Sequence, residues 1–294
     1  MATLEVEEVI PSLLIEVCVD SVESAVNAVK GGADRLEVCA NLGAGGGTTP
    51  SVGLVRSIQK ALRDVPLMIM VRPRVGDFVY NHHELEIMLE DIESFKELGI
   101  RGFVVGALTK GGTVDIDGMK RRYITLGRSE HSSTDPAIAN LMAPTLQDII
   151  DIGGISRLLT SGHGPSVSSS LPSLERIFER AKELQGSDIW GITVMPGGGV
   201  NRNTIAPVVQ RLLPKGLREI HLSGGKWVPS EAQFRRSGMG FGASPEHDWE
   251  VWQTNKKEVQ RVREAADIAW DQYWDGFSDP EAGAEDSAVS PVQE

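Results

Sequence analysis

The sequence predicts an α/β protein built as a (β/α)₈ TIM-type barrel. From Leu13 to Gly225, short apolar runs alternate with amphipathic stretches of helical period. Several runs lack polar alternation, which is typical of parallel strands that are covered on both faces. Polar and glycine residues follow many of the runs, and a barrel gathers all its strand C-termini round one mouth, whereas an open sheet has one switch point. Because no GxGxxG motif opens the first helix, we prefer the barrel to an open doubly wound sheet.

Seven runs have the composition of strands, and seven stretches have helical patterning. The expected strands are 13–19, 35–39, 67–71, 102–105, 157–160, 189–195 and 219–222. The expected helices are 21–31, 51–63, 84–98, 115–126, 144–152, 171–185 and 202–213. Asp20 and Ser21 can cap the first helix, and glycines stand after several helices, where a left-handed C-cap is favoured.

The fifth strand position, near 128–138, is the exception. It contains Arg128-Ser-Glu-His-Ser-Ser-Thr-Asp-Pro136, which is polar and has no β pattern. We therefore expect the fifth strand to be degraded or replaced. A barrel that lacks a strand exposes two sheet edges, a cost that can exceed a total stability of about 5–15 kcal/mol.

The two ends of the chain differ in composition from the barrel. We expect a disordered N-terminus over 1–11, a barrel over 12–245, a Trp-rich amphipathic helix over 246–277 and a disordered acidic tail over 278–294. The expected helix contains Trp249, Trp252, Trp270 and Trp274. Its apolar stripe most simply packs on its own barrel, and a dimer interface is the alternative.

Composition excludes several classes of partner. A net charge of −12 disfavours nucleic acid and anionic membranes. No apolar run approaches the roughly 20 residues that span a bilayer, and the acidic segment from Met1 to Val9 does not have the pattern of a targeting peptide. With two cysteines in the chain, we expect a reducing cytoplasm and no structural disulfide.

The tripeptide Glu-Val-Cys occurs twice, at Glu16–Cys18 and at Glu37–Cys39. Period-two alternation puts each glutamate on the face of its cysteine, and neighbouring strands in register would bring the cysteines side by side. A buried cysteine is more often a small core residue, but both of these lie at strand ends, where barrel sites lie. Thiolates select Cu(I) or Zn²⁺, and because no further ligand motif is present, two thiolates suit Cu(I) better.

Four polar residues are candidates for the lining of the mouth and for catalysis: Glu16, Glu37, Arg72 and His221. Arg72 can pair with Glu16 or Glu37, or it can clamp an anionic ligand. His221 can be an acid–base group or a third soft ligand, although a hydrogen-bonded core histidine is more common.

Two glycine-rich loops follow the last two strands and contain Gly197, Gly198 and Gly199, then Ser223 and Gly224. In barrels, these loops often hold a phosphate through backbone N–H groups. A tight turn needs glycine as well, so a small anionic ligand and a simple turn both remain open here.

Further motifs run in order along the chain: Glu16-Val-Cys-Val-Asp-Ser21, Gly32-Ala-Asp-Arg-Leu-Glu-Val-Cys39, Gly47-Thr-Thr-Pro50, Val71-Arg-Pro-Arg74 with Gly76-Asp77, Gly106-Ala-Leu-Thr109, Leu159-Thr-Ser-Gly162, Met195-Pro-Gly-Gly-Gly199 and His221. Together they resemble the copper homeostasis protein CutC family. The resemblance implies a (β/α)₈ barrel, a cytoplasmic location, a homo-oligomer, and a role in copper binding with Cys18 and Cys39 as the copper-binding residues.

The chain departs from the family pattern in three places. The family has a Phe-His-Arg-Ala-Phe-Asp strand where this chain has the polar segment, and a one-base frame shift over Ser132–Thr134 would produce that difference. Ser223-Gly-Gly-Lys stands where the family usually has Ser-Ala-Arg, which weakens the expectation of an anion site. The Trp-rich extension is not part of the shared core.

We therefore expect a cytoplasmic copper homeostasis protein that holds Cu(I) between Cys18 and Cys39. The alternative is a TIM-barrel enzyme that acts on a small phosphorylated or carboxylated metabolite, with Arg72 and the glycine loops at the anion. A third reading is a degraded family member whose faulty fifth strand prevents a stable barrel.

Overall fold

The computed structural model describes residues 12–120, 137–140, 146–185, 191–236 and 238–278. Its main feature is an eight-stranded sheet with the order β7-β6-β5-β4-β3-β2-β1-β8, in which all neighbouring strands are parallel. The strands are β1 Leu14–Val19, β2 Arg35–Val38, β3 Leu67–Met70, β4 Gly102–Val105, β5 Ala137–Asn140, β6 Ile155–Thr160, β7 Thr193–Pro196 and β8 Glu219–Leu222.

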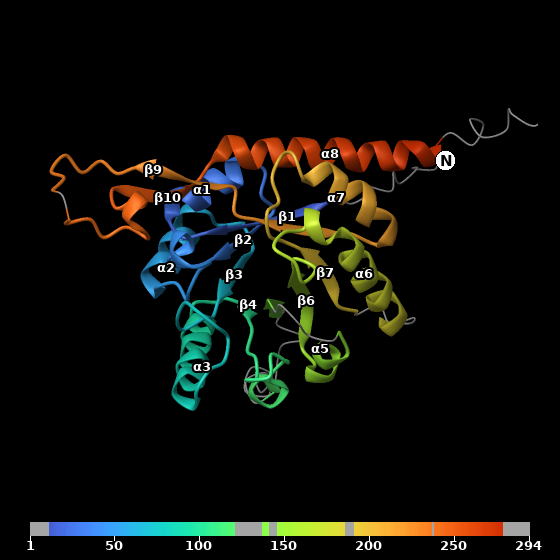
Figure 1. Cartoon of the computed structure of the whole chain (residues 1–294), viewed down its shortest axis with the longest axis horizontal. Helices are drawn as coiled ribbons and strands as arrows, with labels where there is room; N and C mark the ends of the chain where they lie inside the picture. The colour runs from blue at the N-terminus through green and yellow to red at the C-terminus, as the bar shows by residue number, and fades with distance from the viewer. Residues whose placement is uncertain (1–11, 121–136, 141–145, 186–190, 237, 279–294) are drawn as a thin grey trace, which may run out of the picture.

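The parallel sheet curls, so that the two strands at the ends of its order approach each other. Gly197, directly after β7, forms a parallel bridge with His221 of β8. Figure 1 shows the strands arranged around the middle of the molecule, with α2 and α3 on one side and α5, α6 and α7 on the other. Because neighbouring strands are parallel, their carboxyl ends lie at one edge of the curled sheet.

The helices cover the outside of the sheet. They are α1 Val22–Lys30, α2 Val52–Ala61, α3 His82–Glu97, α5 Leu146–Ile152, α6 Leu171–Gln185, α7 Ile205–Leu212 and α8 Lys256–Ser278, and residues 116–120 are helical as well. Local sequence fixes where they begin. The Ser21 side chain accepts a hydrogen bond from the Ser24 amide at α1, and Asn81 with Glu84 forms a capping box at α3.

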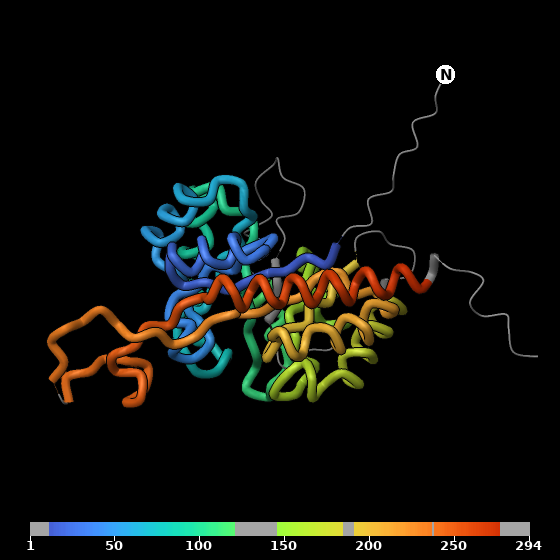
Figure 2. The backbone as a smooth tube through the Cα atoms, turned by 90° about the horizontal axis from the view of Figure 1, so that it is seen from above, coloured from blue at the N-terminus to red at the C-terminus, as the bar shows by residue number. Residues whose placement is uncertain are grey.

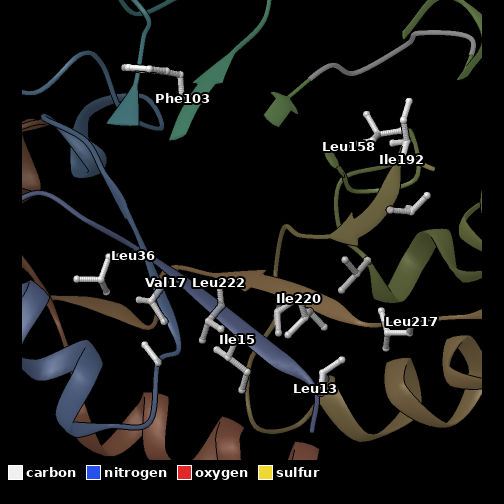
Figure 3. Close-up of a cluster of buried hydrophobic side chains, with 14 of the residues drawn as sticks. Leu13, Ile15, Val17, Leu36, Phe103, Leu158, Ile192, Leu217, Ile220 and Leu222 are labelled. Atoms are coloured by element: carbon white, nitrogen blue, oxygen red, sulfur yellow. The ribbon is translucent and has the colours of Figure 1, made fainter. Parts of the chain in front are cut away.

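The main hydrophobic core lies between the sheet and these helices. Period-two alternation sends Ile15 and Val17 of β1 into this core, together with Ile220 and Leu222 of β8 (Figure 3). The residues between them, Glu16 and His221 among these, must therefore face the inside of the curl. The alternation thus separates an apolar outer layer from a polar inner face.

The seven expected strands and seven expected helices are found close to their predicted places, and three of them, 115–126, 144–152 and 189–195, extend into residues outside the described ranges. The helix expected over 115–126 is seen as 116–120, because 121–136 lies outside the described residues. The parallel α/β fold is confirmed.

The fifth strand position is occupied. The polar stretch up to Pro136 lies outside the described residues, but Ala137–Asn140 forms β5, which pairs with β4 and β6. The register with β6 shifts between Ala137 and Ile138. A short strand therefore stands at the position where a degraded or replaced strand was expected, since four residues suffice when both neighbours supply backbone partners.

The Trp-rich C-terminal region is a hairpin followed by a helix. Strands β9 Gly225–Pro229 and β10 Glu250–Thr254 are antiparallel, with Trp227 opposite Trp252. The helix expected over 246–277 therefore begins only at Lys256, because Pro245–His247 forms a short 3-10 turn and Glu250–Thr254 pairs as a strand. Residues 1–11 and 279–294, where disorder was expected, lie outside the described residues.

Helix α8 packs on its own chain, as the simpler of the two alternatives predicted. Its apolar stripe of Val259, Val262, Ala266, Ala269 and Trp270 is buried in the main core. The helix contacts α7 and α1, and Figure 2 shows it lying lengthwise beside them. The division of the chain at residues 245 and 277 stays a prediction.

Candidate functional site

The inner face of β1, β2 and β8 carries an unusual set of buried polar and sulfur side chains. Glu16 is 0% exposed, Glu37 2%, Cys18 7% and His221 8%. The strand register brings them together, because Glu16 lies beside His221 on one side of β1 and Cys18 lies beside Glu37 on the other. Buried charges need partners, so each contact of this set bears on its chemistry.

A network of two arginines and two glutamates occupies the deeper part of this face. The Arg35 Nε–H donates to Glu16 Oε2 at 2.5 Å, and Arg35 Nη2 donates to Glu219 Oε2 at 2.6 Å. Arg157 Nε lies 2.9 Å from Glu219 Oε2. Alternating charges compensate one another here, as a low-dielectric interior requires.

Glu16 belongs both to this network and to the site above it. Its Oε1 lies 2.9 Å from His221 Nδ1. Burial favours the neutral acid, but the hydrogen bond with His221 and the charge of Arg35 outweigh it and lower the pKa of Glu16. Glu16 is therefore an ionised residue that orients the His221 ring.

Cys18, Glu37 and His221 form a compact group in which one ligand atom from each residue lies within 4.8 Å of the others. His221 Nε2 is 3.6 Å from Glu37 Oε2, and Glu37 Oε1 is buried without a hydrogen-bond partner. Burial and the charge of Glu16 raise the pKa of Glu37 to about 7, against the opposing charge of His221. Although burial opposes it, hydrogen bonds with Cys18 and Glu16 raise the pKa of His221 well above its usual value.

The two cysteines are close but not aligned. Cys18 lies opposite Glu37 in the ladder, so the expected alignment with Cys39 is wrong by two residues. Both thiols are free and buried, and they share one cluster with Met70. The Cys39 thiol donates to the Glu37 carbonyl oxygen at 3.8 Å.

Both cysteine pKa values lie above the usual thiol value, because burial disfavours the thiolate. The hydrogen bond with His221 partly offsets this effect at Cys18. At Cys39, the charge of Glu37 adds to burial, and the pKa rises well above the usual value. Cys18 is therefore the thiol that ionises more readily.

Arg72 does not pair with Glu16 or Glu37, so that expectation is wrong. Its Nη1 donates to the carbonyl oxygens of Gly45 and Gly47, each at 2.8 Å, and its Nη2 donates to the Gly76 carbonyl at 2.8 Å. Arg35 is instead the cation beside Glu16. Arg72 therefore holds the glycine-rich loop after β2 in place, and its Nε is buried without a hydrogen-bond partner.

Most of the predicted anion-site residues line one cavity of about 430 Å³. The lining residues are Cys18, Leu159, Thr160, Ser161, Gly164, Pro165, Gly197, Gly198, Gly199, Val200, His221, Leu222 and Ser223. Gly224 is not among them, and a Cβ at this position would lie 2.8 Å from the Val259 side chain of α8. Gly198 and Gly199 have positive φ values of 100° and 75°, so their backbone conformation itself favours glycine.

Sequence analysis missed Arg35, Arg157 and Glu219, which form the charge network. A usable signal was present, because Arg35, Glu37 and Cys39 alternate within one run and must share a face. Each of the three charged residues is the first residue of an expected strand, and its side chain faces inward, toward the other charges of the network.

The fold and the site together define a class: an α/β protein with a curled parallel sheet whose inner face carries free thiols, a histidine and carboxylates at the strand ends. Comparison with known proteins narrows this class. The CutC family model matches residues 13–226, and the chain belongs to the CutC family.

Individual relatives agree with this assignment. The chain is 39% identical over 239 residues to a human copper homeostasis protein cutC homolog, covering 79% of this chain and 80% of that protein. The mouse homolog of the same description is 36% identical over 266 residues, covering 88% and 90%. The crystal structure of a CutC protein from Streptococcus agalactiae matches with a TM-score of 0.60 and 26% identity, over 72% of this chain and 98% of that chain.

Among the described residues, no helix combines the length and apolar character that a membrane crossing requires.

Proposed function

We propose that this protein serves copper homeostasis in the cytoplasm by binding Cu(I) through the thiolates of Cys18 and Cys39. Relatives that are described as copper homeostasis proteins support the role. The observation that carries the ligand assignment is the buried cluster in which Cys18, Cys39 and Met70 bring three sulfur side chains together. Thiolate and thioether sulfur are the ligands that Cu(I) prefers over harder ions.

The surroundings of the cluster suit reversible loading of a metal cargo. Because burial holds both thiols in their protonated form, Cu(I) must displace protons to bind, and its charge then compensates the buried thiolates. The Met70 side chain also contacts the loop after β2, where a Cβ on Gly47 would lie 2.9 Å from the Met70 sulfur. Loop and sulfur cluster therefore pack as one unit.

We place this site at the mouth of a closed (β/α)₈ barrel in a homo-oligomer. The bridge between Gly197 and His221 supports closure between β7 and β8. Closure satisfies backbone groups that two free sheet edges would expose. Sedimentation of the purified protein tests the oligomer, and a monomer over the whole concentration range would refute it.

Anaerobic titration with Cu(I) against a competing chelator tests the metal assignment. We expect tight binding by the wild type and its loss in Cys18→Ser and in Cys39→Ser. Met70→Leu weakens binding if the thioether is a third ligand. Met88→Leu is the matched control, because Met88 is a fully buried methionine of the main core. Undiminished binding by both cysteine variants would overturn the proposal.

The second candidate function is an enzyme that acts on a small phosphorylated or carboxylated metabolite. The cavity lined by Gly197, Gly198, Gly199 and Ser223 favours it, because backbone N–H groups at such loops suit an anion. Calorimetric titration with inorganic phosphate tests it. Binding that weakens in Ser223→Ala, but not in the exposed control Ser57→Ala, supports the anion site. No heat of binding in the wild type rejects it.

A further inference from the structure

Cys18 has a second set of potential co-ligands, and this set does not include Cys39. The central strand β1 lies between β2 and β8, so Cys18, Glu37 and His221 come from three adjacent strands. Their ligand atoms, one sulfur, one oxygen and one nitrogen, lie within 4.8 Å of one another. A mixed set of this kind suits a divalent cation of borderline softness, whereas a pair of thiolates suits Cu(I).

The distances are close to those of an occupied site. For a tetrahedral ion with bonds of about 2.0–2.1 Å to nitrogen and oxygen, these two atoms lie about 3.3 Å apart. His221 Nε2 and Glu37 Oε2 are 3.6 Å apart, too far for a good hydrogen bond and near the spacing that a shared metal ion sets. A movement of the two side chains by a few tenths of an ångström would bring these atoms to the spacing that a bound ion requires.

The histidine is oriented as metal-bound histidines are. Glu16 Oε1 holds His221 Nδ1 at 2.9 Å, which leaves Nε2 directed toward Glu37. A carboxylate on the far ring nitrogen is the usual partner of a metal-ligating histidine, since it fixes both the ring and its tautomer. The Arg35 Nε–H in turn donates to Glu16 Oε2 at 2.5 Å and holds this carboxylate in place.

A buried carboxylate oxygen of Glu37 without a hydrogen-bond partner indicates that a cation can bind at this place. Glu37 is 98% buried, and while its Oε2 faces His221 Nε2, the second oxygen of the same carboxylate, Oε1, has no hydrogen-bond partner. An unpaired buried carboxylate oxygen is costly, and a cation bound at this place would compensate it. With Cys18 as thiolate and Glu37 as carboxylate, two negative charges balance one divalent cation.

The group opens onto the cavity. Cys18 and His221 line the space of about 430 Å³ that Ser161 and the glycines after β7 also line. Three protein ligands and one position open to solvent are the arrangement of catalytic zinc sites, whereas structural sites have four protein ligands.

We propose that Cys18, Glu37 and His221 form a binding site for a divalent cation of the zinc type, with its fourth position open to water or a small anion in the cavity. The site goes beyond the Cu(I) pair and shares Cys18 with it, so the two metals compete for this thiolate. In the second candidate function, a metal ion bound here would act as a Lewis acid on a substrate beside the glycine-rich loops.

Co²⁺ is a spectroscopic probe for this site, added to the metal-free full-length protein under anaerobic conditions. We expect one equivalent to give a sulfur-to-cobalt charge-transfer band and the intense d–d absorption of four-coordinate cobalt, both reversed by Zn²⁺. Cys18→Ser removes the charge-transfer band. Glu37→Gln and His221→Gln weaken binding by about tenfold or more, while the Cys39→Ser control binds as the wild type does. Added inorganic phosphate shifts the d–d bands if the fourth position is open.

The outcomes separate this inference from the Cu(I) proposal. Loss of Co²⁺ binding in Cys39→Ser with retention in His221→Gln would overturn the three-residue site in favour of the thiol pair. Absence of a charge-transfer band in the wild type would overturn it as well. Cu(I) binding that persists in His221→Gln supports separate donor sets, and failure of Cu(I) binding in the wild type leaves the cobalt result intact. Glu37→Gln is the variant least expected to disturb folding, because it keeps the size of the side chain and one oxygen of Glu37 has no hydrogen-bond partner. Circular dichroism checks that this variant is folded.

Discussion

Replacing Arg35 with methionine removes the cation that lies between two buried carboxylates. Its guanidinium is 2.5 Å from Glu16 and 2.6 Å from Glu219, and the side chains of the three residues are 5%, 0% and 9% exposed. Removing one partner of a buried ion pair typically costs about 3–5 kcal/mol, because the remaining charge is left uncompensated. For a chain of this size, such a loss corresponds to a drop in Tm on the order of 10 °C.

Chemical denaturation followed by circular dichroism measures this loss. Arg211→Met is the matched control, because Arg211 and Glu175 form an ion pair on the surface, with side chains that are 50% and 22% exposed. Exposed pairs contribute about 0–1 kcal/mol. If Arg35→Met destabilises the protein no more than Arg211→Met does, the buried network does not have the energetic role that its geometry implies.

Two further predictions concern local structure. The hydrogen bond from the Asn81 amide and the Arg74 side chain lower the pKa of the Glu84 carboxyl. The stability that the Glu84 charge contributes is therefore complete above the usual glutamate pKa. It is lost as the pH falls through the lowered pKa. The difference in unfolding free energy between wild type and Glu84→Gln therefore shrinks in acid, and a difference that grows would contradict the capping box. A Cβ on Gly197 would lie 2.6 Å from a leucine of β6, so Gly197→Ala costs about 1–3 kcal/mol in thermal unfolding. Gly276→Ala, with open space around it, stabilises α8 by up to about 1 kcal/mol, and equal effects at the two glycines would refute the close approach.

Much of the fold could be predicted because it depends on local patterns. Apolar runs gave the strands within a few residues, and capping residues such as Ser21 gave the helix starts. The fifth strand could not be found in this way, because Ala137–Asn140 has four residues and follows a polar stretch. Strand β10 falls within the helix expected over 246–277, because apolar spacing over only five residues fits the period of a helix as well as that of a strand.

The sequence predicts which residues lie on the inner face of the candidate site, but it does not predict which of them are neighbours. Alternation placed Glu16, Cys18, Glu37 and Cys39 on the inner face, and each of them is buried there. Register was not predictable, since a two-residue shift between β1 and β2 leaves every side chain on the same face and no local pattern opposes it. That shift puts Glu37, in place of Cys39, directly beside Cys18.

The amino-acid order by itself determined which residues face inward, where the chain turns, and which loops carry glycine, because these depend on periods of two and 3.6 and on backbone freedom. Tertiary structure alone decided which inward residues meet. Arg35 pairs with Glu16, while Arg72 holds the loop after β2. His221 reaches Glu16 across 205 residues of sequence. Such contacts depend on strand order and register, which are set by packing of the whole sheet and are absent from any local stretch of the chain.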